Sequence, residues 1–316
     1  MKDLLALVAD ATAGDPMSEL RWTYKSVSKL AKALRQKGHA IGAVTVGRLL
    51  KEADYSLRTN RKSMARTHEP DRDRQFRYIA QQRRRFQKHG NPGISIDTKK
   101  KELVGLFKNP GRTWRRDAID VSDHDFPSLA LGRGIPFGVY DDIRRTGFVV
   151  VGTSNETAAF AGEAISSWWE DHGRWCYPKA DCWFIEADGG GANNSRTWAW
   201  KWALQQLADH WRVTITVSHY PPGASKWNPI EHRLFSRISA NWQGEPLKDY
   251  ETMLGYIRDT TSSTGLRCRA VLDTTHYPTR VKITEEQKRS IRIKHSKVLP
   301  RWNYTIYPNQ KRPTYS

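Results

Sequence analysis

Cysteine is scarce in this chain of 316 residues, which has only Cys176, Cys182 and Cys268. No two of them form a C-x-x-C pair, so the sequence predicts neither a disulfide framework nor a structural zinc site. No apolar run approaches the roughly 20 residues that span a bilayer. The N-terminal segment MKDLLALVADATAGDP has acids within its apolar stretch, unlike a signal peptide. We therefore expect a cytoplasmic protein with no membrane partner.

Acidic residues are outnumbered, because 33 Asp and Glu stand against 52 Lys and Arg, giving a formal net charge of +19. The imbalance is uneven: residues 1–92 carry 20 basic and 9 acidic side chains, and the remaining residues carry 32 and 24. Such an excess is typical of proteins that bind nucleic acid. The simpler alternative is a solvated basic surface that serves only solubility.

Two short helices are expected near the N-terminus. Apolar side chains in residues 25–37 and 43–53 recur at the spacing of one helical face, and Gly38 separates the two patterns. Any pair of adjacent helices would look similar, but the basic charge favours a helix-turn-helix-like DNA-binding domain over residues 1–67. The side chains expected to contact DNA are Thr45, Arg48 and Lys51 on the second helix, then Arg58, Arg61 and Lys62 in the basic segment that follows it.

A basic connecting helix is predicted over residues 71–89, within a linker of residues 68–92. Beyond it the pattern changes to short apolar runs alternating with helical patterns, around a long polar loop at 108–134. The expected strands cover 93–97, 102–107, 136–141, 148–152, 182–188 and 213–217. This order indicates an α/β fold, a mixed sheet flanked by helices as in ribonuclease-H-like proteins, over residues 93–262. A less regular C-terminal extension is expected over residues 263–316.

Three acids occupy positions that suit metal-dependent chemistry. Asp97 and Asp188 each lie at the end of an apolar run that predicts a buried strand. Glu231 lies just inside a helix whose start is predicted by Asn228-Pro229. Strand-end carboxylates project over the edge where ligands bind. Hard cations such as Mg²⁺ prefer oxygen ligands. A pair of Mg²⁺ ions, for which Mn²⁺ can substitute, would suit in-line displacement at a phosphodiester. Asp97, Asp188 and Glu231 are therefore the candidate catalytic and metal-binding residues.

Other residues near these acids are candidates for supporting or competing roles. Lys99, Lys100, Lys226 and Asn228 are expected to contact DNA close to the site. A glycine triplet after Asp188 would allow close approach of a phosphate backbone, although it equally describes a flexible loop. The competing acids are Glu102, the pair Asp141-Asp142, and the loop cluster Asp117, Asp120, Asp123 and Asp125, which lacks a rigid support. The auxiliary candidates are His124, His219 and His232.

Several long segments resemble one known family. They include DPMSELRWTYKSVSKLAKALRQKGH at 15–39, HEPDRDRQFRYI at 68–79, DTKKKELVGLFKNPGRTW from Asp97, ADGGGANNSR at 187–196, HYPPGASKWNPIEHRLFS at 219–236 and TGLRCRAVLDTTHYPTRVK at 264–282. Together they resemble the Rhodopirellula-type DDE transposases of bacterial insertion sequences. The resemblance covers nearly the whole chain and implies a ribonuclease-H-like core. It also implies a DDE triad formed by the Asp of DTKKKE, the Asp of ADGGG and the Glu of NPIEH, which are Asp97, Asp188 and Glu231 in this chain.

The resemblance implies DNA cleavage at the ends of a mobile element and joining of the freed 3′-hydroxyl to target DNA. It further implies a homo-oligomer assembled on DNA, in the cytoplasm and associated with the nucleoid. Such families usually carry a longer DNA-binding region upstream, so recognition of the element ends is expected to be weaker here or supplied by another chain. The residues alone leave two alternatives: a ribonuclease-H-like nuclease of other specificity, or a domesticated DNA-binding protein without catalysis.

Overall fold

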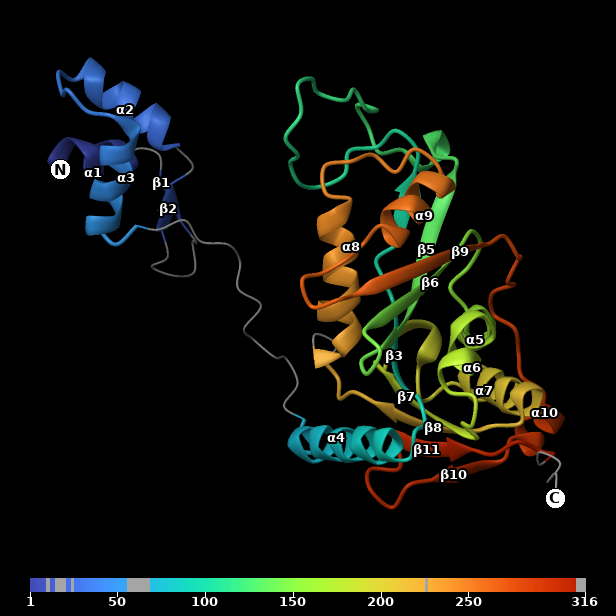
Figure 1. The fold of residues 1–316 in the computed structure, drawn as a ribbon. Coiled ribbons are helices and arrows are strands. Elements are labelled where there is room, and N and C mark those ends of the chain that lie inside the picture. The colour runs from blue at the N-terminus through green and yellow to red at the C-terminus, as the bar shows by residue number, and fades with distance from the viewer. Residues whose placement is uncertain (10–11, 15–20, 24–25, 56–68, 225–226, 311–316) are drawn as a thin grey trace. The chain divides into compact units, whose positions relative to one another are not determined.

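The computed structural model describes residues 1–9, 12–14, 21–23, 26–55, 69–224 and 227–310. The chain divides into two compact units, residues 1–65 and residues 66–316 (Figure 1). Each unit has its own hydrophobic core, and each is described separately below.

In its described residues, the first unit contains three short helices and a small hairpin. The helices are α1 (Lys2–Ala9), α2 (Val27–Gln36) and α3 (Ala43–Glu52), and the antiparallel strands are β1 (Thr12–Gly14) and β2 (Arg21–Thr23). Ser26 caps α2 by accepting a hydrogen bond from the Lys29 backbone N–H. Apolar side chains of all three helices form one core, which includes Leu4, Leu30 and Val46. The two helices expected from the sequence are both present.

The predicted DNA contacts in this unit fall into two groups. Thr45, Arg48 and Lys51 are exposed on α3, and Arg48 forms an ion pair with Glu52 at 2.7 Å. Arg58, Arg61 and Lys62 lie outside the described residues. A role for either group in DNA binding therefore stays a prediction.

Within the described residues, the second unit is built on a mixed sheet of nine strands. The strands are β3 (Gly93–Thr98), β4 (Glu102–Val104), β5 (Gly132–Asp141), β6 (Thr146–Gly152), β7 (Cys182–Ala187), β8 (Thr214–His219), β9 (Arg267–Asp273), β10 (Ile293–His295) and β11 (Asn303–Ile306). Their order is β10-β11-β8-β7-β3-β5-β6-β9, with β4 paired to β5. The central five, β6-β5-β3-β7-β8, have β5 antiparallel to both β3 and β6, and β7 and β8 parallel to β3. This is the ribonuclease-H-like arrangement, so the predicted α/β class, a mixed sheet flanked by helices, is confirmed. The helix-turn-helix-like character of the N-terminal unit stays a prediction.

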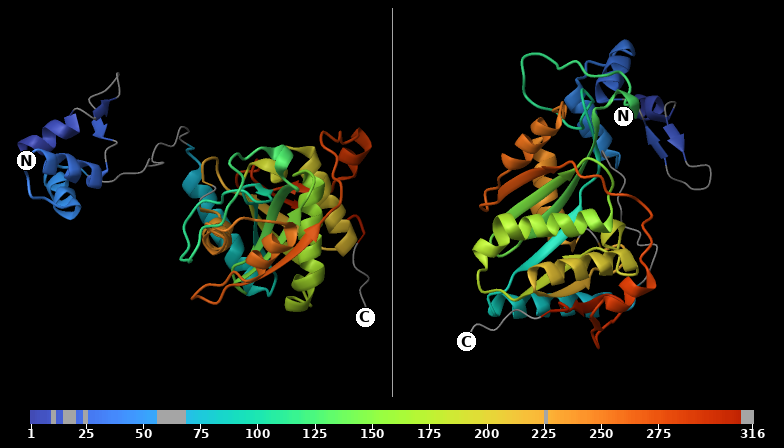
Figure 2. Two further views of the ribbon diagram at one scale, coloured as in Figure 1. Left: turned by 90° about the horizontal axis from the view of Figure 1, so that it is seen from above. Right: turned by 90° about the vertical axis from the view of Figure 1, so that its right-hand side faces the viewer.

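Helices cover both faces of this sheet (Figure 2). On one face, α5 (Ala158–Trp168) and α7 (Trp198–Trp211) pack on the largest core, which contains Ile94, Ile96 and Trp183. On the other face lie α4 (Arg72–Lys88), α8 (Ser236–Asn241) and α9 (Tyr250–Arg258). The short elements are α6 (Arg174–Cys176), α10 (Glu285–Ser290), 3-10 turns at Pro127–Leu129 and Gly191–Asn193, and π-helical turns at Trp169–Gly173 and Glu231–Phe235.

The C-terminal segment is more ordered than the sequence predicts. Residues 263–316 were expected to form a less regular extension, yet β9 pairs in parallel with β6, and β11 pairs antiparallel with β8. The segment therefore extends the sheet on both sides. β10 and β11 have three and four residues, too few to show an alternating pattern, and their pairing with distant strands is visible only in three dimensions.

The predicted connecting helix and long loop are also present, with shifted limits. α4 begins and ends one residue inside the expected range, and it packs against β7 through Phe86 and Phe184. The loop after β4 ends at Leu131, because β5 begins earlier than expected, at Gly132. In the part of the chain that the structure describes, each helix is too short or too polar to cross a membrane.

Candidate active site

Strand register brings two of the predicted acids to one edge of the sheet. β3 and β7 are parallel neighbours, and Ile96 pairs with Ala187. Asp97 is the next residue on β3, and Asp188 directly follows the end of β7. Side chains alternate between the two faces of a sheet. Since Ile96 and Ala187 point into the core beneath α5 and α7, the two aspartates point to the opposite face, which also carries the helix with Glu231.

The helix of residues 229–241, hereafter the Glu231 helix, is tied directly to β3. Asn228, whose side chain is fully buried, donates from Nδ2 to the Ile96 carbonyl oxygen at 3.1 Å. Ser95 Oγ donates to Asn228 Oδ1 and accepts from the Ile230 backbone N–H at 3.2 Å. These bonds fix the start of the helix beside the residues that precede Asp97. Asn228 was predicted to contact DNA, but a side chain with no exposed surface cannot do so in this conformation.

A glycine allows this helix to lie close to the sheet. Gly138 pairs with Asp97 across β3 and β5. A Cβ atom at Gly138 would lie 2.7 Å from the Phe235 ring and 2.8 Å from Ile230 Cδ1, closer than side chains tolerate. The missing side chain therefore makes room for the turn of helix that carries Glu231.

The three carboxylates interact electrostatically. Asp97 is only 8% exposed, and burial together with the negative charges of Asp188 and Glu231 raises the pKa of Asp97 to about 8. A hydrogen bond with the Glu231 side chain contributes to this pKa shift, whereas the Thr98 N–H, which donates to Asp97 Oδ1 at 2.7 Å, opposes it. Burial and the two neighbouring carboxylates therefore favour the protonated form of the Asp97 carboxyl.

Asp188 is held by the loop that follows β7 and by a buried histidine. Its Oδ1 accepts from the Gly190 N–H at 3.1 Å, and its backbone carbonyl accepts from His219 Nδ1 at 2.9 Å. His219 is fully buried, which lowers its pKa to about 4, so the ring is neutral. With Nδ1 donating, Nε2 accepts the hydroxyl proton of Tyr304 at 2.9 Å. Burial raises the pKa of Asp188 itself, and the nearby charge of Glu156 raises it further.

We expect Tyr304→Phe to weaken the support of Asp188. The variant leaves His219 Nε2 buried without a donor, a loss of about 1–3 kcal/mol in the free energy of unfolding. Loss of such a supporting contact commonly reduces activity by roughly tenfold or more. Thermal denaturation and DNA cleavage assays measure the two effects. The matched control is Tyr307→Phe, at a tyrosine that is 36% exposed. Equal behaviour of the two variants would contradict the role of Tyr304.

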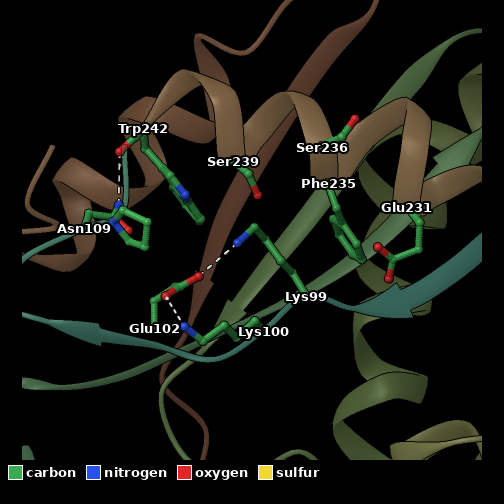
Figure 3. Close-up of a pocket in the computed structure, with 10 residues that line it drawn as sticks. Lys99, Lys100, Glu102, Asn109, Glu231, Phe235, Ser236, Ser239 and Trp242 are labelled. Atoms are coloured by element: carbon green, nitrogen blue, oxygen red, sulfur yellow. Dashed lines mark hydrogen bonds and ion pairs between the residues drawn. The ribbon is translucent and has the colours of Figure 1, made fainter. Parts of the chain in front are cut away.

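A pocket of about 530 Å³ lies along the Glu231 helix (Figure 3). Figure 3 shows Lys99 reaching between Glu102 and Trp242 at one end, with Glu231 at the other end beyond Phe235. Lys99 Nζ lies 2.9 Å from Glu102 Oε1 and 4.5 Å from the centre of the Trp242 ring. Its side chain is 8% exposed, whereas that of Lys100 is 79% exposed. Three lysines near the site were predicted to contact DNA: Lys100 is accessible, Lys99 is buried, and Lys226 lies outside the described residues.

The carboxylates suit a hard cation, although they are not gathered around one point. Within the described ranges, no three His, Cys, Asp or Glu side chains are grouped closely enough to hold a metal ion together. The donors nevertheless fit Mg²⁺ or Mn²⁺ chemically, because all are carboxylate oxygens and because a bound cation would offset the repulsion between these neighbouring acids.

The competing acids lie elsewhere. Asp141 pairs with Ile94 at the beginning of β3, the end of the strand opposite Asp97, and its carboxylate accepts from Tyr177 Oη at 2.7 Å. The loop acids Asp117, Asp120, Asp123 and Asp125 are all exposed. Glu102 lines the pocket with Glu231 and is paired with Lys99.

Sequence reasoning missed several residues that shape this site. Ser95, which was not among the candidates, accepts a hydrogen bond from the start of the Glu231 helix. His219 was among the auxiliary candidates, and it supports the backbone of Asp188. Glu156 lies close enough to Gly191 that a Cβ there would be 2.7 Å from Glu156 Oε1. Asn193 donates to Asp188 Oδ1 at 3.2 Å when its amide is oriented to satisfy both groups. Ser95, Glu156 and Asn193 have no local sequence signal that would have identified them.

The chain matches the family model of the Rhodopirellula transposase DDE domain over residues 3–308. It belongs to this family. The resemblance inferred from the sequence is therefore confirmed, and the site above lies in a transposase-family fold. No curated protein matches the chain.

Solved structures of Mos1 transposase are similar to this transposase-family chain. A Mos1 paired-end complex with the left transposon end has 12% identity and a TM-score of 0.44, covering 81% of this chain and 69% of that one. The Mos1 strand transfer complex has 12% identity and a TM-score of 0.42, with coverage of 81% and 68%. A Mos1 mariner paired-end complex with Mn has 11% identity and a TM-score of 0.40, with coverage of 81% and 69%.

Proposed function

We propose that this chain is a divalent-metal-dependent DNA transposase that cleaves the ends of an insertion sequence and transfers the 3′-hydroxyl into target DNA. Asp97, Asp188 and Glu231 are its proposed catalytic residues. The observation that supports this most strongly is the proximity of the three acids, which are distant in sequence: burial and the charges of Asp188 and Glu231 raise the pKa of Asp97 at one edge of the sheet. Membership of a transposase family supports DNA transposition over the other reactions that such a site could perform.

The residues of the site have distinct roles in this proposal. Asp97, Asp188 and Glu231 would hold two Mg²⁺ ions, which when bound would activate the attacking oxygen and stabilise the leaving oxygen. Ser95 and Asn228 keep the Glu231 helix against β3, and His219 keeps the backbone of Asp188 in place. Lys100, exposed at the mouth of the pocket, is the proposed contact to a phosphate near the scissile bond.

The remaining parts of the chain complete the proposal. Residues 1–67 form a helix-turn-helix-like DNA-binding domain that uses the exposed Thr45, Arg48 and Lys51. Residues 68–92 form the basic connection, and residues 93–262 form the catalytic domain, supported by residues 263–316. We further propose that the protein acts as a homo-oligomer on element ends and target DNA in the nucleoid.

A plasmid assay tests this function directly. The substrate is a supercoiled plasmid that carries the coding sequence with its native flanking DNA on both sides. We expect Mg²⁺ or Mn²⁺ to induce nicks at two defined positions that bracket the gene, together with products joined to a second plasmid. Primer extension maps the nicks, and sequencing of the junctions identifies strand transfer.

Two outcomes would redirect the proposal. Cleavage of RNA–DNA hybrids in preference to the flanking DNA would indicate a ribonuclease-H-like nuclease of other specificity. Binding of DNA without any cleavage, unchanged by Mg²⁺, would indicate a domesticated DNA-binding protein. A plasmid without the flanking DNA is the matched control.

A further inference from the structure

The outer face of α4 carries a stripe of cations that the proposed active site does not use. Arg74, Arg77, Arg84, Arg85 and Lys88 are all exposed. At 3.6 residues per turn, these five positions fall within an arc of about 100° on the helix surface. The stripe extends about 21 Å along the axis, at 1.5 Å per residue. Its length matches about six phosphates of one DNA strand, at 3.4 Å each.

The charges of this stripe are not compensated within the described structure. In the described ranges, none of the five cations has a carboxylate oxygen within 4 Å, the limit for an ion pair. Asp73 is the only acid within α4, and it falls just outside the arc. Glu69 and Asp71, which precede the helix, both pair with Arg301. Neighbouring side chains of like charge on a helix repel one another, so binding of a polyanion stabilises a face of this kind.

The opposite face of α4 is fixed rigidly to the sheet. Gln75 Nε2 donates to the His219 carbonyl at 2.8 Å, and its amide also exchanges hydrogen bonds with Asn303 at 2.9 and 2.7 Å. Arg83 forms a two-point ion pair with Glu186 on β7. α4 packs against β7 and β3. The cations therefore stand on a supported surface, and their helix needs no ordering when a ligand binds.

One end of this surface lies close to the proposed site. His219, which accepts a bond from Gln75 through its carbonyl, donates to the Asp188 carbonyl through its ring. At the same end, Arg72 lies 4.9 Å from the ring centre of Trp227, the residue before Asn228. A polyanion bound along α4 would therefore extend toward the edge of the sheet that carries the three acids.

We propose that the stripe of α4 is a backbone-binding track for duplex DNA, distinct from the surface of residues 1–65. Its cations contact phosphates regardless of sequence and keep the duplex next to the catalytic carboxylates. This inference rests on the proposed function, since it assumes that DNA is the substrate. It assigns a second place on the chain where DNA is held.

The test compares two triple variants of the full-length protein. Arg77→Gln/Arg84→Gln/Lys88→Gln removes three charges from the track. Lys179→Gln/Lys282→Gln/Arg289→Gln removes three exposed charges elsewhere, two of them in or next to α10, which packs on α7 against the other face of the sheet. Fluorescence anisotropy without divalent metal measures binding of a 30-base-pair duplex of arbitrary sequence at several salt concentrations, so cleavage plays no part.

We expect the track variant to lower the slope of log affinity against log salt by about 2.7, since each lost phosphate contact removes about 0.9. The control variant should change this slope by less than the roughly 0.9 expected for one phosphate contact. Arg77→Lys/Arg84→Lys/Lys88→Arg should retain the wild-type slope, which shows that charge matters and that the helix still folds. Equal losses in the track and control variants would overturn the proposal, as would a loss seen only with double-stranded RNA. If the wild-type protein cuts DNA while the track variant binds normally, the track fails and the transposase function stands.

Discussion

Asp97→Asn is expected to abolish DNA cleavage while making the folded protein more stable. The substitution removes a proposed metal ligand, and we expect a loss of at least about 1,000-fold in rate, equivalent to roughly 4 kcal/mol in the activation barrier. It also removes a buried acid that is repelled by Asp188 and Glu231. DNA binding should persist, because the cations of α3 and α4 are untouched. Cleavage, anisotropy and thermal denaturation measure the three effects.

The stability gain has a predicted pH dependence. The pKa of Asp97 is raised to about 8 in the folded state from an ordinary value near 3.8. Between these values the unfolded chain loses the proton and the folded chain keeps it, so Asp97 makes the wild type progressively less stable as pH rises from about 4 to 8. The melting temperature of Asp97→Asn should therefore exceed that of the wild type by an increasing margin over this range.

Metal addition provides a check that does not depend on activity. Mg²⁺ or Mn²⁺ should raise the melting temperature of the wild type near pH 8 and have a much smaller effect on Asp97→Asn. Asp117→Asn, in the exposed loop, is the matched control and should behave as the wild type. Normal cleavage by Asp97→Asn would remove this residue from the site, and a metal response that disappears only in Asp117→Asn would place the metal in the loop.

Arg83→Met is expected to cause the largest loss of stability among single substitutions of α4. Glu186 is 3% exposed at its side chain, and its carboxylate is held by Arg83 and by Tyr220 Oη at 2.6 Å. Without the guanidinium, a buried negative charge has no counter-charge, which typically costs about 3–5 kcal/mol. In a unit of this size the melting temperature should fall by about 10 °C. Differential scanning calorimetry measures the change.

A double variant separates charge from packing in this prediction. Arg83→Met/Glu186→Leu removes both partners and should recover most of the lost stability, because no charge remains buried. Arg84→Met changes the neighbouring exposed arginine and should leave the melting temperature nearly unchanged. A double variant as unstable as Arg83→Met would show that the loss arises from packing of α4 and not from the ion pair.

Much of the architecture was accessible from the sequence, because it rests on local patterns. The apolar run before Asp97 and the helix pattern of α4 were recognisable without coordinates. The segment Asn228-Pro229 predicted a helix start, since an Asn cap and a proline in the first turn have a direct physical reason. Family membership followed from long ordered segments. Local patterns do not reveal which distant strands pair. For this reason the sequence predicts only an irregular extension where the structure has β9, β10 and β11.

The roles of individual polar residues depended on burial, which the sequence does not reveal. Asn228 and Lys99 stand beside the catalytic candidates and were assigned to DNA, yet Asn228 is fully buried and Lys99 lies against Trp242 and Glu102. Whether a polar side chain faces DNA or the protein interior depends on contacts made by residues more than a hundred positions away.

By itself, the sequence determined the basic charge, the main secondary structure and the three acids proposed for the site. Each of these depends on composition or on short-range patterns along the chain. Only the tertiary structure decided that Ile96 lies opposite Ala187, that Ser95 and Asn228 draw the Glu231 helix onto β3, and that α4 turns its cations outward. These outcomes result from the register of parallel strands and from hydrogen bonds between distant segments, which form only when the whole sheet is assembled.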